Sequence, residues 1–305
     1  MAGHTRASLA ADFGRLGLAA GATVLVHAAM KPVGPVDAPL PDPAPDRLPD
    51  RLPGPAADPA AETVLAALRD VLGPRGTVVV PAFTESNSAS SRLHRRLTAA
   101  MTAQEAARHR AAMPAFDPAH TPSEQVGRLA EAVRRAPGAH RSGHPQTSFA
   151  ALGARAAAVV ARHHAHDHLG EHSPLRALYD TDAAIVLLGV GYAVCSAFHL
   201  AEYRIQDPPY RDYSCVVRCD GAARWITYRD VALDDGDFPA LGAAFERAAG
   251  AGTAYDADLP APRAVGRGPV GNAESRVLPL RDAVDFAVGW LSENRPRPPR
   301  RLPGV

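Results

Sequence analysis

The sequence predicts an α/β fold of three layers, α/β/α, in which helices cover both faces of a mixed central sheet. Short apolar runs rich in β-branched residues, such as 76–81 and 182–191, alternate along the chain with segments of helical period, and glycines flank these runs. Segment 213–228 alternates apolar and polar residues around the turn Asp220-Gly221, a pattern typical of an antiparallel hairpin. This hairpin favours a mixed sheet over a purely parallel one.

Each element follows from its local pattern. Leu9, Phe13 and Leu16 recur near helical spacing at the start of the chain, and buried strands are predicted at 23–26, 76–81 and 182–191. Helices are predicted at 1–20, 60–72, 122–135, 149–162, 196–204, 237–249 and 280–292, with a surface helical region at 85–113.

The chain of 305 residues is predicted to form one domain over residues 1–293. Proline is frequent between residues 35 and 59, where it is mixed with aspartate and arginine. Such a segment has little apolar surface to bury, so we expect a proline-rich surface loop. The tail 294–305 is rich in proline and arginine, and we expect it to be flexible. The sequence does not indicate an oligomeric state.

Composition argues against several classes of partner. The formal net charge is +1 at pH 7, so neither a nucleic acid nor an anionic membrane is expected to bind. The longest apolar run, 183–190, suits a buried strand and is too short to span a bilayer. Cys195, Cys215 and Cys219 form no CxxC pair, so we expect reduced thiols and a cytoplasmic protein.

The strongest candidate site follows the strand predicted at 182–191. A glycine turn after this strand leads into a helix that carries His199 and, one turn later, Glu202. Ligands of open α/β sheets bind beyond the carboxyl ends of strands, and a partly buried histidine with a carboxylate partner suits a general base. A core histidine with a structural hydrogen bond would give the same pattern.

Two loops could approach an anionic ligand through their main-chain N–H groups. His144 and Ser148 precede a predicted helix, which also fits a helix cap beside a surface histidine. The segment after the first strand ends in Gly34 and is the second candidate for phosphate contact. The residues of that segment that we assign to cofactor binding are Ala29, Met30, Lys31 and Val33.

The histidine-rich run 163–168 nearly matches the HxHxDH motif of binuclear zinc hydrolases. Ala165 falls where that motif needs a histidine, and no second set of ligands follows. A solvated, histidine-rich helix end explains the run, and we expect no metal. A zinc hydrolase that uses His163 to His168 is kept as an alternative.

Several carboxylates gather in the last third of the chain. A run of acidic residues is usually a solvated face, but beside a pocket it would attract a cationic ligand and could orient an imidazole. The residues concerned are Asp230, Asp234, Asp235, Asp237 and, further on, Glu246.

Taken together, these segments resemble the aminoglycoside N3-acetyltransferase family, an acetyl-CoA-using group whose fold is unrelated to the common GNAT fold. The resemblance runs in order from about residue 20 to residue 292. The pieces that carry it are LVHAAMKPVG, GTVVVPAFT, FDPAHTPSEQVGRLAEAVRRAPGAHRSGHPQTSFAALG, LGEHSPLRALYDTDAAIVLLGVGYAVCSAFHLAEYR and GPVGNAESRVLPLRDAVDFAVGWL.

The resemblance implies acetyl transfer from acetyl-CoA to an aminoglycoside, at the 3-amino group of 2-deoxystreptamine, as in antibiotic resistance. It places the catalytic histidine at His199 in the HLAE element. It implies that Glu246 or Asp235 supports this base, with Glu202 as the next candidate. It also implies that the acidic run 230–237 and Tyr192 contact a cationic small-molecule substrate.

This chain departs from the family pattern at three places. His27-Ala28-Ala29 stands where the family shows HSS, which puts the acetyl-CoA contacts in question. Tyr192 and Cys195-Ser196 differ on the side that lines the drug, and the loop 35–59 is longer than usual. An acetyltransferase for a different amine metabolite, and a homologue that binds acetyl-CoA without turnover, therefore stay as alternatives.

Overall fold

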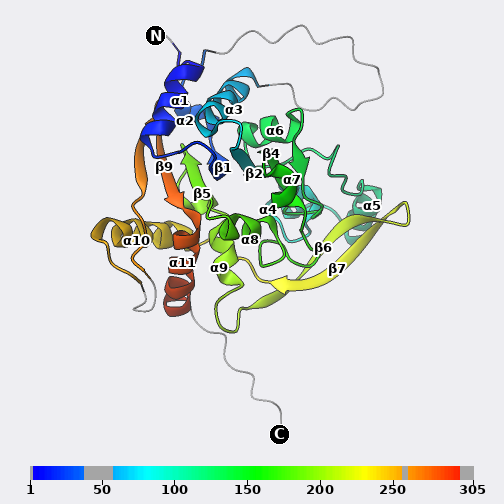
Figure 1. The fold of residues 1–305 in the computed structure, drawn as a ribbon. Helices are drawn as coiled ribbons and strands as arrows, with labels where there is room; N and C mark the ends of the chain where they lie inside the picture. Colours follow the sequence, from blue (N-terminus) through cyan, green and yellow to red (C-terminus); the bar gives the residue numbers. More distant parts are fainter. Residues whose placement is uncertain (1–2, 38–57, 256–259, 296–305) are drawn as a thin grey trace, which may run out of the picture.

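A seven-stranded mixed sheet forms the centre of the computed structural model, which describes residues 3–37, 58–255 and 260–295 (Figure 1). The strand order is β3-β4-β2-β1-β5-β9-β8. The central strands β2 (Thr77–Pro81), β1 (Thr23–Ala28) and β5 (Ala184–Leu188) are mutually parallel. Two strands are added on each side, each antiparallel to the strand it pairs with: β4 (Phe149–Gly153) and then β3 (His140–Arg141) beside β2, and β9 (Ala273–Pro279) and then β8 (Gly266–Val270) beside β5.

Helices cover both faces of this sheet, which confirms the predicted three-layer α/β/α fold. Side chains alternate along each strand, so Leu25 faces one core and its neighbours Val24 and Val26 face the other. The helices on the Val24 side are α1 (Arg6–Arg15), α3 (Pro59–Leu72) and α6 (Arg128–Arg135). Those on the Leu25 side are α7 (Ala156–Val160), α8 (Pro174–Asp180), α9 (Phe198–Glu202), α10 (Phe238–Ala251) and α11 (Leu280–Asn294).

The remaining elements lie around the carboxyl ends of the parallel strands. The short helix α2 (Met30–Val33) follows β1, and η2 (Tyr192–Val194) follows β5. The surface region predicted at 85–113 contains η1 (Glu85–Asn87), α4 (Arg92–Thr98) and α5 (Ala103–Ala112). The predicted hairpin is present as β6 (Tyr210–Cys219) and β7 (Ala222–Val231), with Asp220 and Gly221 between the strands.

The structure corrects three predictions of local structure and adds two strands that were not predicted. The helix predicted at 149–162 is wrong in its first part, because Phe149–Gly153 pairs with β2 as strand β4. The helix predicted from residue 122 begins only at Arg128, after the left-handed backbone of Gly127. The hairpin forms its own two-stranded sheet, and the central sheet is mixed because of β4, β3, β9 and β8. Strands β8 and β9 were not predicted, because Gly266 to Val270 carries no run of apolar residues.

Most of the predicted loop 35–59 and of the tail 294–305 lies outside the described residues. At the near end of the loop Val36 forms a β-bridge with His4, and at the far end Asp58 caps α3 through the N–H groups of Ala60 and Ala61. Asn294 is the last residue of α11, and Arg295 has defined partners, so this part of the tail is not free as predicted.

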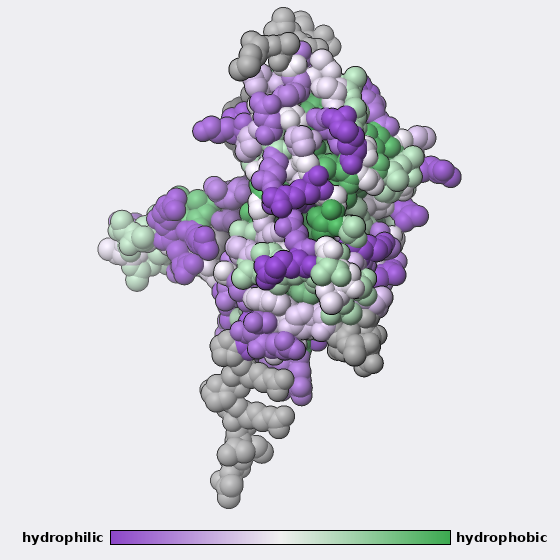
Figure 2. Space-filling view, turned by 90° about the vertical axis from the view of Figure 1, so that its left-hand side faces the viewer, coloured by the Kyte–Doolittle hydropathy of each residue, from purple (hydrophilic) through white to green (hydrophobic). Residues whose placement is uncertain are grey.

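On the face shown in Figure 2, hydrophilic residues predominate and hydrophobic patches are small and interrupted. Among the described residues, none of the helices is both long and apolar enough to span a bilayer. The three cysteines are free, with Cys195 and Cys215 buried.

Helix α10 offers a direct test of the packing, because two of its glycines have opposite surroundings. A Cβ at Gly242 would lie 1.9 Å from the Tyr192 ring, whereas one at Gly250 would meet nothing within 4 Å. We expect Gly242→Ala to lower the free energy of unfolding by about 1–3 kcal/mol through overpacking. Gly250→Ala should raise it by about 0.5–1 kcal/mol through helix propensity. Denaturant unfolding of both variants measures this, and equal effects of the two substitutions would contradict the packing.

Candidate active site

A cavity of about 990 Å³ opens at the carboxyl edge of the parallel strands. This edge is where an open α/β sheet offers a crevice, because strands end there and loops diverge. His199 lies in the wall of the cavity at the start of α9, and part of the acidic run lies in the same wall. The lining residues come from 83–95, 146–147, His168, His199, 209–213, 232–237 and 294–295.

His199 forms a close pair with Glu202. Its Nδ1 lies 2.6 Å from Oε2 of Glu202, which stands one helical turn later in α9. The ring also packs against Phe238, with 4.8 Å between ring centroids, and 14% of the His199 side chain stays exposed. When Nδ1–H donates to the carboxylate, the lone pair of the neutral ring is on Nε2. Within the described parts of the chain no hydrogen bond engages this Nε2.

Glu202 is held by donors from three elements. Its side chain is only 1% exposed, and besides His199 its carboxylate accepts from the main-chain N–H of Asp234 at 3.0 Å. The guanidinium of Arg295, at the end of α11, donates to the same oxygen, Oε1. A buried carboxylate needs such partners to stay charged. The group that orients His199 is therefore Glu202.

The prediction that Glu246 or Asp235 orients His199 is wrong. Glu246 lies on α10 and pairs with Arg276, with 2.7 Å between Arg276 Nε and Glu246 Oε1. Asp235 lines the cavity, but its side chain is half exposed and its ion-pair partner is Arg92, at 3.9 Å. Glu202, the next candidate, occupies the orienting position because it shares a helix with His199.

The segment 232–237 forms one wall of the cavity, which brings three of the predicted substrate-side carboxylates next to His199. Asp234, Asp235 and Asp237 all line the cavity. Asp237 is engaged by Arg295, whose Nε and Nη2 lie 2.6 Å from its two oxygens. The lining is not purely acidic, however, because it also includes Arg92, Arg95, Arg211 and Arg295.

Asp230 does not lie at the rim as predicted. It is 4% exposed and accepts from His168 Nδ1, the His168 main-chain N–H and the Tyr203 hydroxyl, each at 2.8 Å. Burial alone would raise the pKa of Asp230, but these hydrogen bonds outweigh it and lower the pKa. Asp230 therefore attaches β7 to the loop that carries His168.

Tyr192 also lies elsewhere than predicted. Its ring packs against Gly242 of α10 and beneath the guanidinium of Arg276, and it is not among the residues that line the cavity. The resemblance to the family placed it on the drug side, at a position where this chain departs from the family pattern. The turn of η2 instead directs the ring toward α10.

The predicted cofactor-binding residues divide into two groups. Val33, His144 and Ser148 have fully buried side chains, and His144 Nδ1 accepts the main-chain N–H groups of Gln146 and Thr147 at 3.2 and 3.1 Å. The Ser148 hydroxyl donates to the carbonyl of Ala82 at 2.8 Å. These side chains hold the loops in place rather than face a cavity. Ala29 precedes α2, and Met30 and Lys31 form its first turn.

The histidine-rich run 163–168 is tied into the fold by ordinary hydrogen bonds. His163 Nδ1 lies 2.9 Å from the Ser142 hydroxyl and its Nε2 lies 2.9 Å from the carbonyl of His168. Its ring stacks on that of His144. Across residues 3–37, 58–255 and 260–295, no three His, Cys, Asp or Glu side chains are arranged to hold a metal ion. The predicted solvated helix end therefore describes only part of the run: His164 and His166 are exposed, whereas His163 and His168 are tied into the fold.

His27 is a further titratable group beside the candidate base. It ends the buried part of β1, and its Nε2 lies 3.3 Å from the Ser196 hydroxyl. Burial and, to a smaller extent, the nearby His199 ring lower the pKa of His27 to about 3. His27 is therefore neutral at physiological pH and adds no positive charge next to His199.

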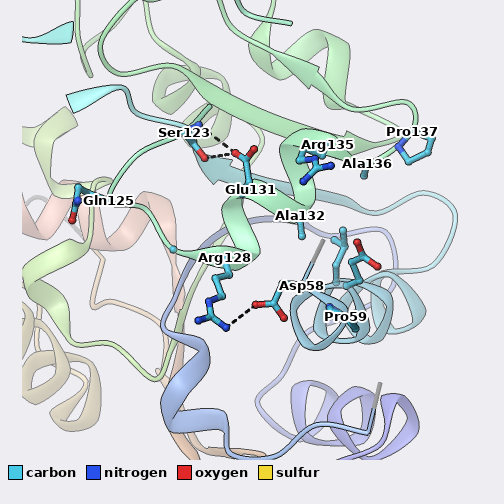
Figure 3. A pocket seen from close by; sticks show the side chains of 13 residues that line it. Asp58, Pro59, Ser123, Gln125, Arg128, Glu131, Ala132, Arg135, Ala136 and Pro137 are labelled. Atoms are coloured by element: carbon cyan, nitrogen blue, oxygen red, sulfur yellow. Dashed lines mark hydrogen bonds and ion pairs between the residues drawn. The ribbon is translucent and has the colours of Figure 1, made fainter. Parts of the chain in front are cut away.

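A second cavity, of about 890 Å³, lies between α3 and α6. Figure 3 shows Arg128 of α6 pointing to Asp58 at the start of α3, at 3.1 Å, and Ser123 bonded to Glu131. The cavity also reaches Gly127, which packs so close to the carbonyl of Ala28 that a Cβ there would lie 2.7 Å from its oxygen. It therefore adjoins the end of β1.

The chain is similar to known proteins in both sequence and structure. The family described as aminoglycoside 3-N-acetyltransferase matches residues 25–292. Aminoglycoside N(3)-acetyltransferase VII of Streptomyces paromomycinus is 37% identical over 98% of this chain and 95% of its own length. YokD from Bacillus subtilis superposes with a TM-score of 0.78 at 28% identity, covering 95% of this chain and 100% of that chain. AAC-IIIb, solved as a binary complex with CoASH, gives a TM-score of 0.72 at 26% identity, covering 97% and 100%.

The buried histidines predict how stability depends on pH. Burial lowers the pKa of His144 and His168, and that of His27 to about 3, so the unfolded chain binds protons that the folded chain does not. The free energy of unfolding should therefore fall as pH drops below about 6.5, by about 1.4 kcal/mol per pH unit for each such histidine. His144→Gln should make this slope shallower by about the contribution of one histidine.

The measurement is denaturant unfolding between pH 7 and pH 4.5. His164→Gln is the matched control, because His164 belongs to the same histidine-rich region but is exposed. An unchanged slope in His144→Gln, or an equal change in both variants, would show that His144 is not kept neutral by the fold.

Proposed function

Since this chain belongs to the aminoglycoside 3-N-acetyltransferase family, we propose that it transfers the acetyl group of acetyl-CoA to the 3-amino group of an aminoglycoside, with His199 as general base. The observation that carries this proposal is the His199–Glu202 pair. The ring of His199 lines a cavity large enough for a sugar-sized acceptor. Acetyl-CoA is made and used in the cytoplasm, so we place the reaction there.

The geometry suits proton removal from an attacking amine. As the amine nitrogen bonds to the acetyl carbonyl carbon, Nε2 of His199 takes its proton and the imidazolium is stabilised by Glu202. Cleavage of the carbon–sulfur bond then releases the CoA thiolate, which takes the proton back from His199. The products are the N-acetylated amine and CoA thiol, and the base is restored. Positioned bases of this kind contribute roughly 10²–10⁴-fold in rate.

We assign the donor to the cavity between α3 and α6. It adjoins Ala28 and thus the start of α2, where the sequence placed the acetyl-CoA contacts. Arg128 and Arg135 line it and suit the phosphates of CoA, although Asp58 is the ion-pair partner of Arg128. The donor cavity and the His199 cavity are neighbours, since the N–H of Glu124 donates to the carbonyl of Phe83 at 2.7 Å. Phe83 lines the latter cavity and the residues on either side of Glu124 line the former.

A second acceptor class is favoured by the arginines of the His199 cavity. Glu85, Asp234 and Asp235 suit the ammonium groups of an aminoglycoside. Arg95 and Arg211 line the same cavity, and no carboxylate lies within ion-pair distance of either in the described ranges. An amine that also carries an acidic group would match both signs of charge, which favours an amine metabolite as the alternative acceptor.

A thiol-release assay with acetyl-CoA and a panel of aminoglycosides tests the proposed function. We expect turnover by the wild type and a loss of at least ~10²-fold in kcat for His199→Ala, because the base is removed. Binding of acetyl-CoA, measured by calorimetry, should be nearly unchanged. Wild-type turnover in a folded His199→Ala protein would refute the assignment of the base.

The role of Glu202 is separable from that of the other carboxylates. Glu202→Gln removes the charge that orients His199 and stabilises its imidazolium, so we expect kcat to fall by at least ~10-fold with little change in KM. Glu246→Gln is the control, because Glu246 pairs with Arg276 instead. Steady-state kinetics of both variants decide between them, and a larger loss of kcat in Glu246→Gln would reverse the assignment.

A further inference from the structure

Arg295 connects the end of α11 to the catalytic pair, although 93 positions separate it from Glu202 in the sequence. Its side chain is only 17% exposed. It donates to Glu202 Oε1, to both carboxylate oxygens of Asp237 at 2.6 Å, and to the carbonyl of Asp234 at 2.5 Å. Every one of these partners belongs to a residue of the active-site wall or to the carboxylate behind His199.

These contacts meet two needs of Glu202. The carboxylate is almost fully buried, and a buried negative charge is unfavourable unless a positive charge or several donors face it. Arg295 supplies the only full positive charge that the described residues place within ion-pair distance of Glu202, apart from a protonated His199. Because Arg295 binds Oε1, the other oxygen, Oε2, is left to accept from His199.

We propose that Arg295 is a positioning residue for the acetyl-transfer reaction: its guanidinium keeps Glu202 ionised and aimed at His199, and fixes the 234–237 wall to α11. This rests on the proposed function for its kinetic consequence. It goes beyond the assignment of the base, because Arg295 touches neither the acceptor amine nor the thioester. It acts through Glu202 on one side and through Asp237 on the other.

The burial and the hydrogen bonds of the Arg295 guanidinium suit it to this role. Burial alone would lower the pKa of Arg295, but its hydrogen bonds to Asp237 and Glu202 outweigh burial and raise it. An exposed ion pair contributes little, because water screens it. Arg295 differs because it is mostly buried and its planar fork binds two carboxylates and a carbonyl together, which a lysine cannot reproduce.

Removal of the Arg295 charge should change the basicity of His199. Without it, the buried Glu202–His199 pair carries an unbalanced negative charge, so we expect the pair to take up a proton at a higher pH than in the wild type. The pair is then free to accept the proton of the amine only at higher pH. The other titratable or charged groups that contact His199 or line its cavity are His27, Glu85, Arg92, Arg95, His168, Arg211, Tyr213, Asp234, Asp235 and Asp237.

The test compares the pH dependence of kcat in wild type, Arg295→Gln, Arg295→Lys and Arg204→Gln. For Arg295→Gln we expect kcat at pH 7 to fall roughly 10-fold and the acidic limb of the profile to move up by about 0.5–1 pH unit. Arg295→Lys should recover part of both effects. Arg204→Gln is the matched control: Arg204 is 18% exposed, also pairs with a carboxylate, Glu171, and lies two residues after Glu202.

Two further measurements distinguish an effect of Arg295 on His199 from a role in holding the cavity wall alone. If Arg295 only holds the wall, Asp237→Asn and Arg295→Gln should both raise KM and leave the limb of the kcat profile in place, which would overturn the proposal. NMR titration of the His199 ring in wild type and Arg295→Gln needs no turnover, so it tests the proposal even if no aminoglycoside is acetylated. An unchanged His199 pKa in folded Arg295→Gln would also overturn it.

Discussion

The negative charge of Glu202, held almost entirely away from water, is the constraint around which this active site is built. Such a charge requires donors on every side, and here they come from different parts of the chain: His199 on the same helix, the N–H of Asp234 and the guanidinium of Arg295. The position of α9, the path of the 232–237 segment and the end of α11 are therefore coupled through one carboxylate.

The central sheet determines where Glu202 and His199 are placed. Three parallel strands end at one edge: His27 stands near the end of β1, Phe83 follows β2, and the turn into α9 follows β5. Gly189 makes that turn with φ +63°, where a Cβ would lie 3.1 Å from the carbonyl of Ala29. The close approach of two strand ends brings the neutral His27 beside His199.

The sequence predicted best where local patterns and structure coincide. The β-branched runs that became β1, β2 and β5 are buried on both faces, and His199 and Glu202 lie one turn apart in a single helix, so both were recognisable. Strand β4 was mistaken for a helix, because alanine-rich segments fit either structure until a partner strand is known. Asp230 and Arg295 could not be assigned, since their partners are distant in sequence and nothing separates Arg295 from the other arginines of its tail.

Strands β6 and β7 pair with each other along their length and belong to no larger sheet. It is attached mainly through side chains: the amide of Asn87 bonds both main-chain groups of Val216, Trp225 bonds the carbonyl of Arg110, and Asp230 bonds His168. Yet Arg211 and Tyr213 of this hairpin line the cavity that His199 faces. Under the proposed function, acceptor recognition would reside partly on a module that evolution can remodel while α9 and α11 are left intact.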